Sequence, residues 1–108
     1  MRILDLPTPA LIADNDIITQ NMTRMAEILS GSAVQLRPHY KSHKCAVLAH
    51  RQIASGAIGM TCAKLAEAED LIFSGIDDIL IANQIVEPAK IDRIARLAGL
   101  CQIGRAHV

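Results

Sequence analysis

The sequence predicts an α/β fold built on a parallel sheet. Three strand–helix units follow one another, with strands that start at Val34, Ile58 and Asp78. Units of this kind form parallel sheets through right-handed crossovers. Apolar residues make up 51% of the chain and aromatic residues only 2%, which is typical of the aliphatic strands and covering helices of α/β proteins.

The N-terminal part is expected to contain one strand and one helix before these units begin. Pro7 and Pro9 disfavour helix at the residues that precede them, and residues 10–13 can then form a short strand. Asp14 is a candidate N-cap for a helix whose apolar residues recur at helical spacing as far as Leu29.

Each repeating unit joins a strand to a helix that a glycine closes. The predicted strands are residues 34–41, 58–62 and 78–82, and the predicted helices are residues 45–55, residues 64–74 and a helix from Pro88 to just before Gly99. A doubly wound open sheet and a (β/α)8 TIM barrel both fit this order. No GxGxxG motif and no P-loop follows a strand. A barrel needs eight units and about 250 residues, so with about three units it would be incomplete.

Composition excludes several classes of protein. Eleven basic residues balance eleven acidic ones, so the chain has no general field that would attract nucleic acid or an anionic membrane. The three cysteines form no close pair, which favours a reducing compartment over a disulfide framework. No signal peptide and no long apolar run is evident. We therefore expect a cytoplasmic protein.

The last residues look foreign to the rest of the chain. Residues 103–108 resemble the in-frame translation of a sequencing adapter, and the alternative is an ordinary short tail. We expect residues 1–102 to form the native part and residues 103–108 to be a non-native tail.

Basic residues gather at the end of the first predicted strand of the repeating units. Side chains alternate along a strand, so Arg37, His39 and Lys41 share one face. Such a row is expensive to bury without a partner and suggests an anionic ligand at the carboxyl end, where parallel α/β folds place catalytic groups. A partly desolvated lysine among cations gives up its proton more readily, and a neutral amine attacks an aldehyde. The alternative is a solvated basic loop.

Several motifs occur in an order typical of one enzyme family. The run Arg37-Pro38-His39-Tyr40-Lys41-Ser42-His43-Lys44 is the most specific of them, and supporting matches lie at residues 6–11, 14–16, 59–69, 75–84 and 88–90. With these motifs the chain resembles, over residues 6–98, the D-threonine aldolase and D-serine dehydratase branch of the alanine-racemase-like enzymes. These enzymes use pyridoxal 5′-phosphate (PLP).

The resemblance implies a fold, a cofactor and a catalytic residue. Lys41 falls on the lysine that holds PLP covalently. The implied fold is an alanine-racemase-type (β/α)8 barrel, here its N-terminal portion, followed by a β domain. The family also uses a divalent metal whose ligands lie far downstream, so no metal ligand is expected within residues 1–108.

Four further residues are candidate cofactor contacts, each with a structural alternative. His39 faces the cofactor or is a satisfied core histidine, and Arg37 contacts the cofactor or neutralises a carboxylate inside the barrel. Thr61 and Asn83 follow later strands, where ligands bind but where polar residues are also ordinary.

Other chemically capable residues are expected to be structural. We expect His43 to help cap the next helix and Cys62 to be a small buried residue. Glu67 and Glu69 are expected on a helix away from the rim, with no chemical role.

The function implied by the resemblance is that of a PLP-dependent lyase acting on a small D-3-hydroxy amino acid. A D-threonine aldolase-like retro-aldol cleavage to glycine and an aldehyde is favoured, and a D-serine dehydratase-like reaction or a non-catalytic PLP carrier is the alternative. The complete protein is expected to be an enzyme with no nucleic-acid or membrane partner. A homodimer is one oligomeric state considered for it. The fragment is expected to be inactive. Residues 1–102 alone are expected to be poorly soluble, because a three-stranded parallel sheet leaves its edges unpaired.

Overall fold

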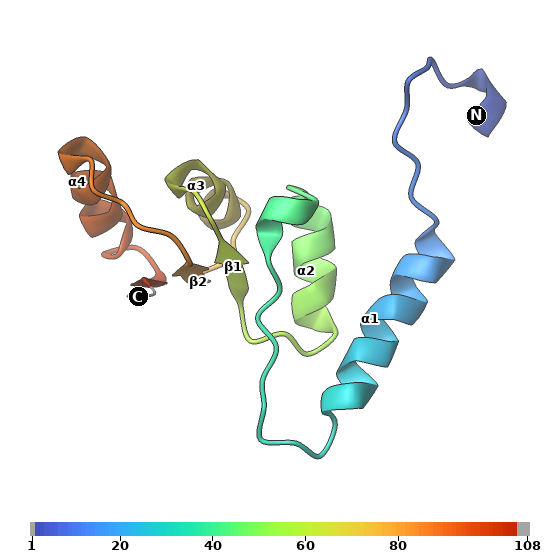
Figure 1. Cartoon of the computed structure of the whole chain (residues 1–108), viewed down its shortest axis with the longest axis horizontal. Helices are drawn as coiled ribbons and strands as arrows, with labels where there is room; N and C mark the ends of the chain where they lie inside the picture. The colour runs from blue at the N-terminus through green and yellow to red at the C-terminus, as the bar shows by residue number, and fades with distance from the viewer. Residues whose placement is uncertain (1, 106–108) are drawn as a thin grey trace.

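The computed structural model describes residues 2–105 (Figure 1). Helices and strands alternate in the order η1 (Ile3–Asp5), α1 (Asn15–Leu29), η2 (Tyr40–Ser42), α2 (Ala46–Ala54), β1 (Met60–Cys62), α3 (Leu65–Phe73), β2 (Asp78–Ile81), α4 (Pro88–Leu97) and β3 (Gln102–Arg105). Figure 1 shows α2, α3 and α4 in a row, with α1 next to α2 and the N-terminal segment extending away.

The three strands form one parallel sheet in the order β1-β2-β3. Met60 pairs with Ile79, and Ile79 pairs in turn with Ile103. The prediction of a parallel α/β fold is therefore confirmed, and the strands expected at residues 58–62 and 78–82 are found as β1 and β2.

The four predicted α-helices are also confirmed, because their signals are local. The Asp14 carboxylate accepts hydrogen bonds from the backbone N–H groups of Asp16 and Ile17 at 2.9 and 3.0 Å, which caps α1. Gly31, with φ +76°, follows the end of α1, and Pro88 occupies the first turn of α4.

Two predicted strands are wrong. Residues 10–13 form no strand: Leu11 is fully exposed, and no described strand pairs with this segment. Residues 34–41 run extended beside β1 but form only a single bridge, between His39 and Thr61. The reason for the second failure is Pro38, which accepts a hydrogen bond from Thr61 N at 2.7 Å but has no N–H to donate to a ladder.

The core lies on one face of the sheet. Met60 and Cys62 of β1 and Ile79 and Ile81 of β2 are at most 1% exposed. They pack in one cluster with side chains of the three helices that follow residue 45: Ala49, Leu65, Ala68, Leu71, Ile94 and Leu97. Helices α2, α3 and α4 therefore cover the same face.

The last described strand overlaps the tail that the sequence marked as foreign. Gln102–Arg105 form β3, and Ile103 packs against the core. Residues 106–108 lie outside the described residues. A non-native origin of this tail stays a prediction.

Candidate active site

Lys41 lies in the short helical turn η2, at the carboxyl-terminal edge of the sheet. The extended segment that leads into η2 pairs through His39 with Thr61, one residue before the end of β1. The turn therefore begins where the strands end, which is the edge at which parallel α/β proteins bind ligands. A strand was expected at Lys41, but the residue sits in a 3₁₀ turn.

The side chain of Lys41 is exposed, whereas partial desolvation was expected. The rim is open here because the described chain places no further strand beyond the segment that carries His39. Among the described residues, no side chain forms an ion pair with the Lys41 amine. The amine is thus available to a ligand.

His39 stands directly beside Lys41 as a half-buried imidazole. Its Nδ1 accepts a hydrogen bond from Lys41 N at 3.2 Å. Burial lowers the pKa of His39, and the positive charges of Lys41 and Lys44 lower it further against the opposing effect of Glu67. A lowered pKa favours the neutral imidazole, the form in which Nδ1 can accept a hydrogen bond.

Both ends of the turn are anchored to helix α3. The buried Tyr40 hydroxyl donates a hydrogen bond to the Asp70 carboxylate. Burial and this hydrogen bond raise the pKa of Tyr40 to about 12, so the hydroxyl remains a donor at neutral pH. At the other end, the Lys44 ammonium pairs with Glu67.

Glu67 was expected to lie away from the rim, and this expectation is wrong. Its side chain is 8% exposed and accepts hydrogen bonds from Ala63 N and Lys64 N at 2.9 and 3.2 Å. Burial alone would raise the pKa of Glu67, but the hydrogen bonds from Lys44, Ala63 and Lys64 outweigh it and lower the pKa from its ordinary value. The available signal was its position as third residue of a helix, where a carboxylate caps free N–H groups.

His43 has the structural role that was expected of it. Its Nδ1 accepts a hydrogen bond from Cys45 N, the N-cap residue of α2, at 3.1 Å. Its Nε2 lies 3.2 Å from Gln52 Oε1, on the same helix. Cys62 is likewise a buried core residue, and burial raises the pKa of its thiol to about 12, so it is not a nucleophile at neutral pH.

Thr61 and Asn83 lie near the same edge of the sheet, but Thr61 is buried and Asn83 is exposed. Thr61 is 9% exposed, and its hydroxyl donates to the Arg37 carbonyl at 3.2 Å. Asn83 is exposed, and its side-chain oxygen accepts a hydrogen bond from Gln84 N at 2.9 Å. Asn83 lines a cavity of about 560 Å³ between the start of α3 and the start of α4.

Arg37 points to the other end of the sheet. Its guanidinium donates to the Asp78 carboxylate at 2.7 Å and to the Asp78 carbonyl at 3.2 Å. Asp78 is the first residue of β2, whereas Asn83 follows the end of that strand. Gly59 lies against this pair, and a Cβ there would overlap both the guanidinium and the Asp78 carbonyl. Arg37 therefore has the carboxylate partner that was its structural alternative.

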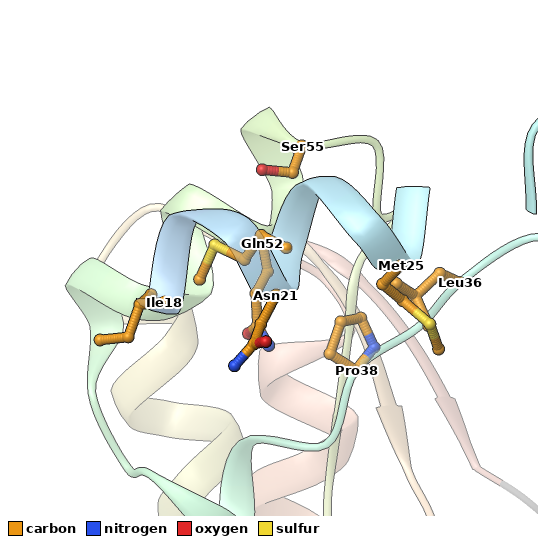
Figure 2. Close-up of a pocket in the computed structure, with 8 residues that line it drawn as sticks. Ile18, Asn21, Met25, Leu36, Pro38, Gln52 and Ser55 are labelled. Carbon is orange, nitrogen blue, oxygen red and sulfur yellow. The ribbon is translucent and has the colours of Figure 1, made fainter. Parts of the chain in front are cut away.

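The structure thus brings His39, Lys41 and Thr61 together and directs Arg37 elsewhere. A separate apolar pocket of about 390 Å³ lies between α1, α2 and the extended segment. Figure 2 shows Leu36 and Pro38 beside it, on the side of the segment that faces these helices. Because side chains alternate along extended backbone, Arg37 and His39 belong to the opposite face, and this pocket is not part of the site.

Within residues 2–105, no three His, Cys, Asp or Glu side chains gather closely enough to hold a metal ion. None of the helices in the same stretch combines the length and apolarity that a membrane crossing requires.

Comparison with known proteins gives aldolases and dehydratases among the relatives of this chain. D-threonine aldolase from Arthrobacter sp. is 41% identical over 96 residues, which is 89% of this chain and 25% of that protein. 3-hydroxy-D-aspartate aldolase from Paracoccus denitrificans is 38% identical over 86% of this chain and 24% of its own length. The crystal structure of D-threonine aldolase from Filomicrobium marinum matches 95% of this chain with a TM-score of 0.90 and 44% identity, over 28% of that protein.

The chain is homologous to D-threonine aldolases and 3-hydroxyaspartate aldolases. The resemblance that the motifs around Lys41 indicated is thereby confirmed. A D-threo-3-hydroxyaspartate dehydratase from Delftia sp. is also 41% identical, over 74% of this chain and 21% of that protein. A metal-free structure of a D-threo-3-hydroxyaspartate dehydratase variant superimposes with a TM-score of 0.84 at 36% identity, covering 93% of this chain and 26% of that chain. The chain spans about a quarter of the length of these relatives. No family model matches it.

Proposed function

We propose that the complete protein is a PLP-dependent lyase that cleaves D-3-hydroxy amino acids, as a D-threonine aldolase does. The observation that carries the proposal is the position of Lys41: an exposed amine at the carboxyl edge of a parallel sheet, beside the imidazole of His39. The homology to aldolases over 86–89% of the chain supports the same reaction class.

We propose further that the sheet is the first part of a (β/α)8 barrel. The extended segment, β1, β2 and β3 are neighbours in chain order without a reversal, and helices α2, α3 and α4 cover one face only. A doubly wound sheet carries helices on both faces, whereas a barrel turns one face inward. The barrel interior would be the face that holds Arg37, His39, Thr61 and Asp78.

The residues at the rim fit a phosphorylated aldehyde. Lys41 offers a primary amine with no ion-pair partner in the described part of the chain, which is the group that condenses with an aldehyde. When bound, PLP supplies an electron sink for cleavage of a bond at the substrate Cα.

Each neighbouring residue has a role in this proposal. His39 contacts the cofactor as a neutral imidazole and fixes the turn through Lys41 N. Thr61 and Asn83 contact cofactor or substrate at the rim. Arg37 remains a predicted cofactor contact, and in the described chain its guanidinium joins the extended segment to β2 through Asp78.

The dehydratase relative supports dehydration as a second candidate reaction. A D-serine dehydratase-like enzyme would use the same lysine but eliminate the β-hydroxyl, and a non-catalytic PLP carrier would turn over nothing. A divalent metal, with ligands outside this chain, belongs to both lyase alternatives. Release of glycine and acetaldehyde from D-threonine supports the aldolase, and release of ammonia without glycine supports the dehydratase.

The cofactor site is tested by chemical trapping. The complete protein is incubated with PLP, reduced with borohydride and digested, and the labelled peptide is identified by mass. We expect the label on Lys41, and Lys44, three residues away, is the internal control. A label confined to Lys44, or no label on the turn, would contradict the proposed site.

A further inference from the structure

We propose that Glu67 on α3 is a positioning residue for Lys41, which it holds in place through Lys44. The proposal rests on the proposed function in one respect, namely that Lys41 is the cofactor lysine. It assigns a role to a carboxylate that lies outside the motif at residues 37–44. Glu67 makes no hydrogen bond to Lys41 itself and acts on it through Lys44.

The first step is that Lys41 receives its rigidity from its neighbours. Its own side chain is exposed, and its backbone N–H donates only to His39, two residues before it. Tyr40, directly before Lys41, donates a hydrogen bond to Asp70 on α3. Lys44, three residues after Lys41, pairs with Glu67 on the same helix. The turn is therefore held at two points against one helix.

The second step is that Glu67 is a stronger anchor than Asp70. Asp70 is exposed, whereas the Glu67 side chain is 8% exposed, and a buried carboxylate is costly unless its oxygens are all engaged. One oxygen of Glu67 accepts from Ala63 N and Lys64 N, directly after β1, and the other pairs with Lys44. One side chain thus joins the end of β1, the start of α3 and the turn.

The third step is the backbone of Lys44. Its φ of +46° lies in the left-handed region, which a side chain with a Cβ seldom adopts and which persists where the surroundings hold it. Lys44 N also donates to the Tyr40 carbonyl at 2.9 Å. The ion pair with Glu67 therefore holds the one residue at which the chain leaves the turn and enters α2.

The experiment compares two acids on the same helix in the complete protein. Glu67→Gln removes the charge that pairs with Lys44, and Glu69→Gln is the matched control because Glu69 pairs with Arg93 on α4. The rate at which PLP labels Lys41 is measured by borohydride trapping and peptide mass, and hydrogen exchange of residues 40–45 is followed in parallel. We expect Glu67→Gln to slow labelling by up to about 10²-fold, the scale of loss when a reacting group is displaced by about 1 Å, and to speed exchange, while Glu69→Gln changes neither.

Lys44→Met removes the other member of the ion pair with Glu67. Because Lys44 is exposed, this variant should fold even where Glu67→Gln does not. It should slow labelling to the same extent, and the double variant should show no additional loss because both changes break one contact. Unchanged labelling in both single variants, or an equal loss in Glu69→Gln, would overturn the positioning role. If the wild-type protein is not labelled at Lys41, the proposed function fails, and hydrogen exchange alone then decides whether Glu67 holds the turn.

Discussion

The two faces of the sheet have opposite characters. The face toward the helices is closed and aliphatic, with Met60, Ile79 and Ile81 at most 1% exposed. The other face carries the partly exposed ion pair between Arg37 and Asp78 and the buried hydroxyl of Thr61. Burial of apolar area supplies the stability of such a unit, so stability lies on the helix side of the sheet and the proposed chemistry lies at its other face and at the rim. Substitutions on the two sides should therefore separate activity from folding.

The largest effect is expected at the rim. Lys41→Ala in the complete protein should lower the rate of D-threonine cleavage by a factor on the order of 10³ or more, because a covalent catalytic group is lost. The free energy of unfolding should stay within about 0.5 kcal/mol of wild type, since the residue is exposed. Steady-state kinetics and urea unfolding measure the two quantities. A large loss of stability would mean that Lys41 serves the fold.

The helix-facing side should show the reverse behaviour. Leu71 of α3 is 0% exposed, and Leu71→Ala should destabilise the protein by about 2–5 kcal/mol through lost burial and an unfilled cavity. Labelling of Lys41 by PLP should remain in the fraction of molecules that is folded. Urea unfolding gives the first quantity and borohydride trapping below the transition gives the second. Loss of labelling in fully folded protein would show that the two faces are coupled.

A smaller loss is expected on the polar face, at Gly59. The φ of this glycine is ordinary, so the constraint is one of space: a Cβ would overlap the Arg37 guanidinium and the Asp78 carbonyl. Gly59→Ala should therefore cost about 1–3 kcal/mol, the usual range for overpacking. Gly99→Ala, where the added Cβ meets its nearest atom at 3.4 Å, is the control. Equal unfolding midpoints for the two variants would exclude the close approach of Gly59 to the ion pair.

The difference between the faces also explains what could be read from the sequence. The helices, strands β1 and β2 and the N-cap at Asp14 follow from local patterns. Lys41 was singled out by the resemblance of residues 37–44 to a family motif, because the local pattern alone also fits a solvated basic loop. The strand expected at residues 34–41 failed at Pro38, where a missing N–H matters more than the alternation of side chains. The ion pairs Arg37–Asp78 and Lys44–Glu67 join residues 41 and 23 positions apart, and no local pattern specifies such partners. For this reason neither the turn at residues 40–42 nor its anchors on α3 could be predicted from the sequence.

The smallest effect concerns the charge of Glu67. Its hydrogen bonds hold the pKa of Glu67 below its ordinary value in the folded chain. The ionised carboxylate therefore contributes to stability above the unfolded-state pKa, and the contribution is lost as the pH falls through the folded-state value. Lys44 is 59% exposed, so solvent screens the pair, and Glu67→Gln should cost less than about 1 kcal/mol at pH 7. Urea unfolding from pH 7 down to pH 3 should show a shallower acid loss for Glu67→Gln than for wild type, with Glu69→Gln as the control. Parallel curves for wild type and Glu67→Gln would show that Glu67 has no lowered pKa, and a steeper curve for the variant would reverse the sign argued from its hydrogen bonds.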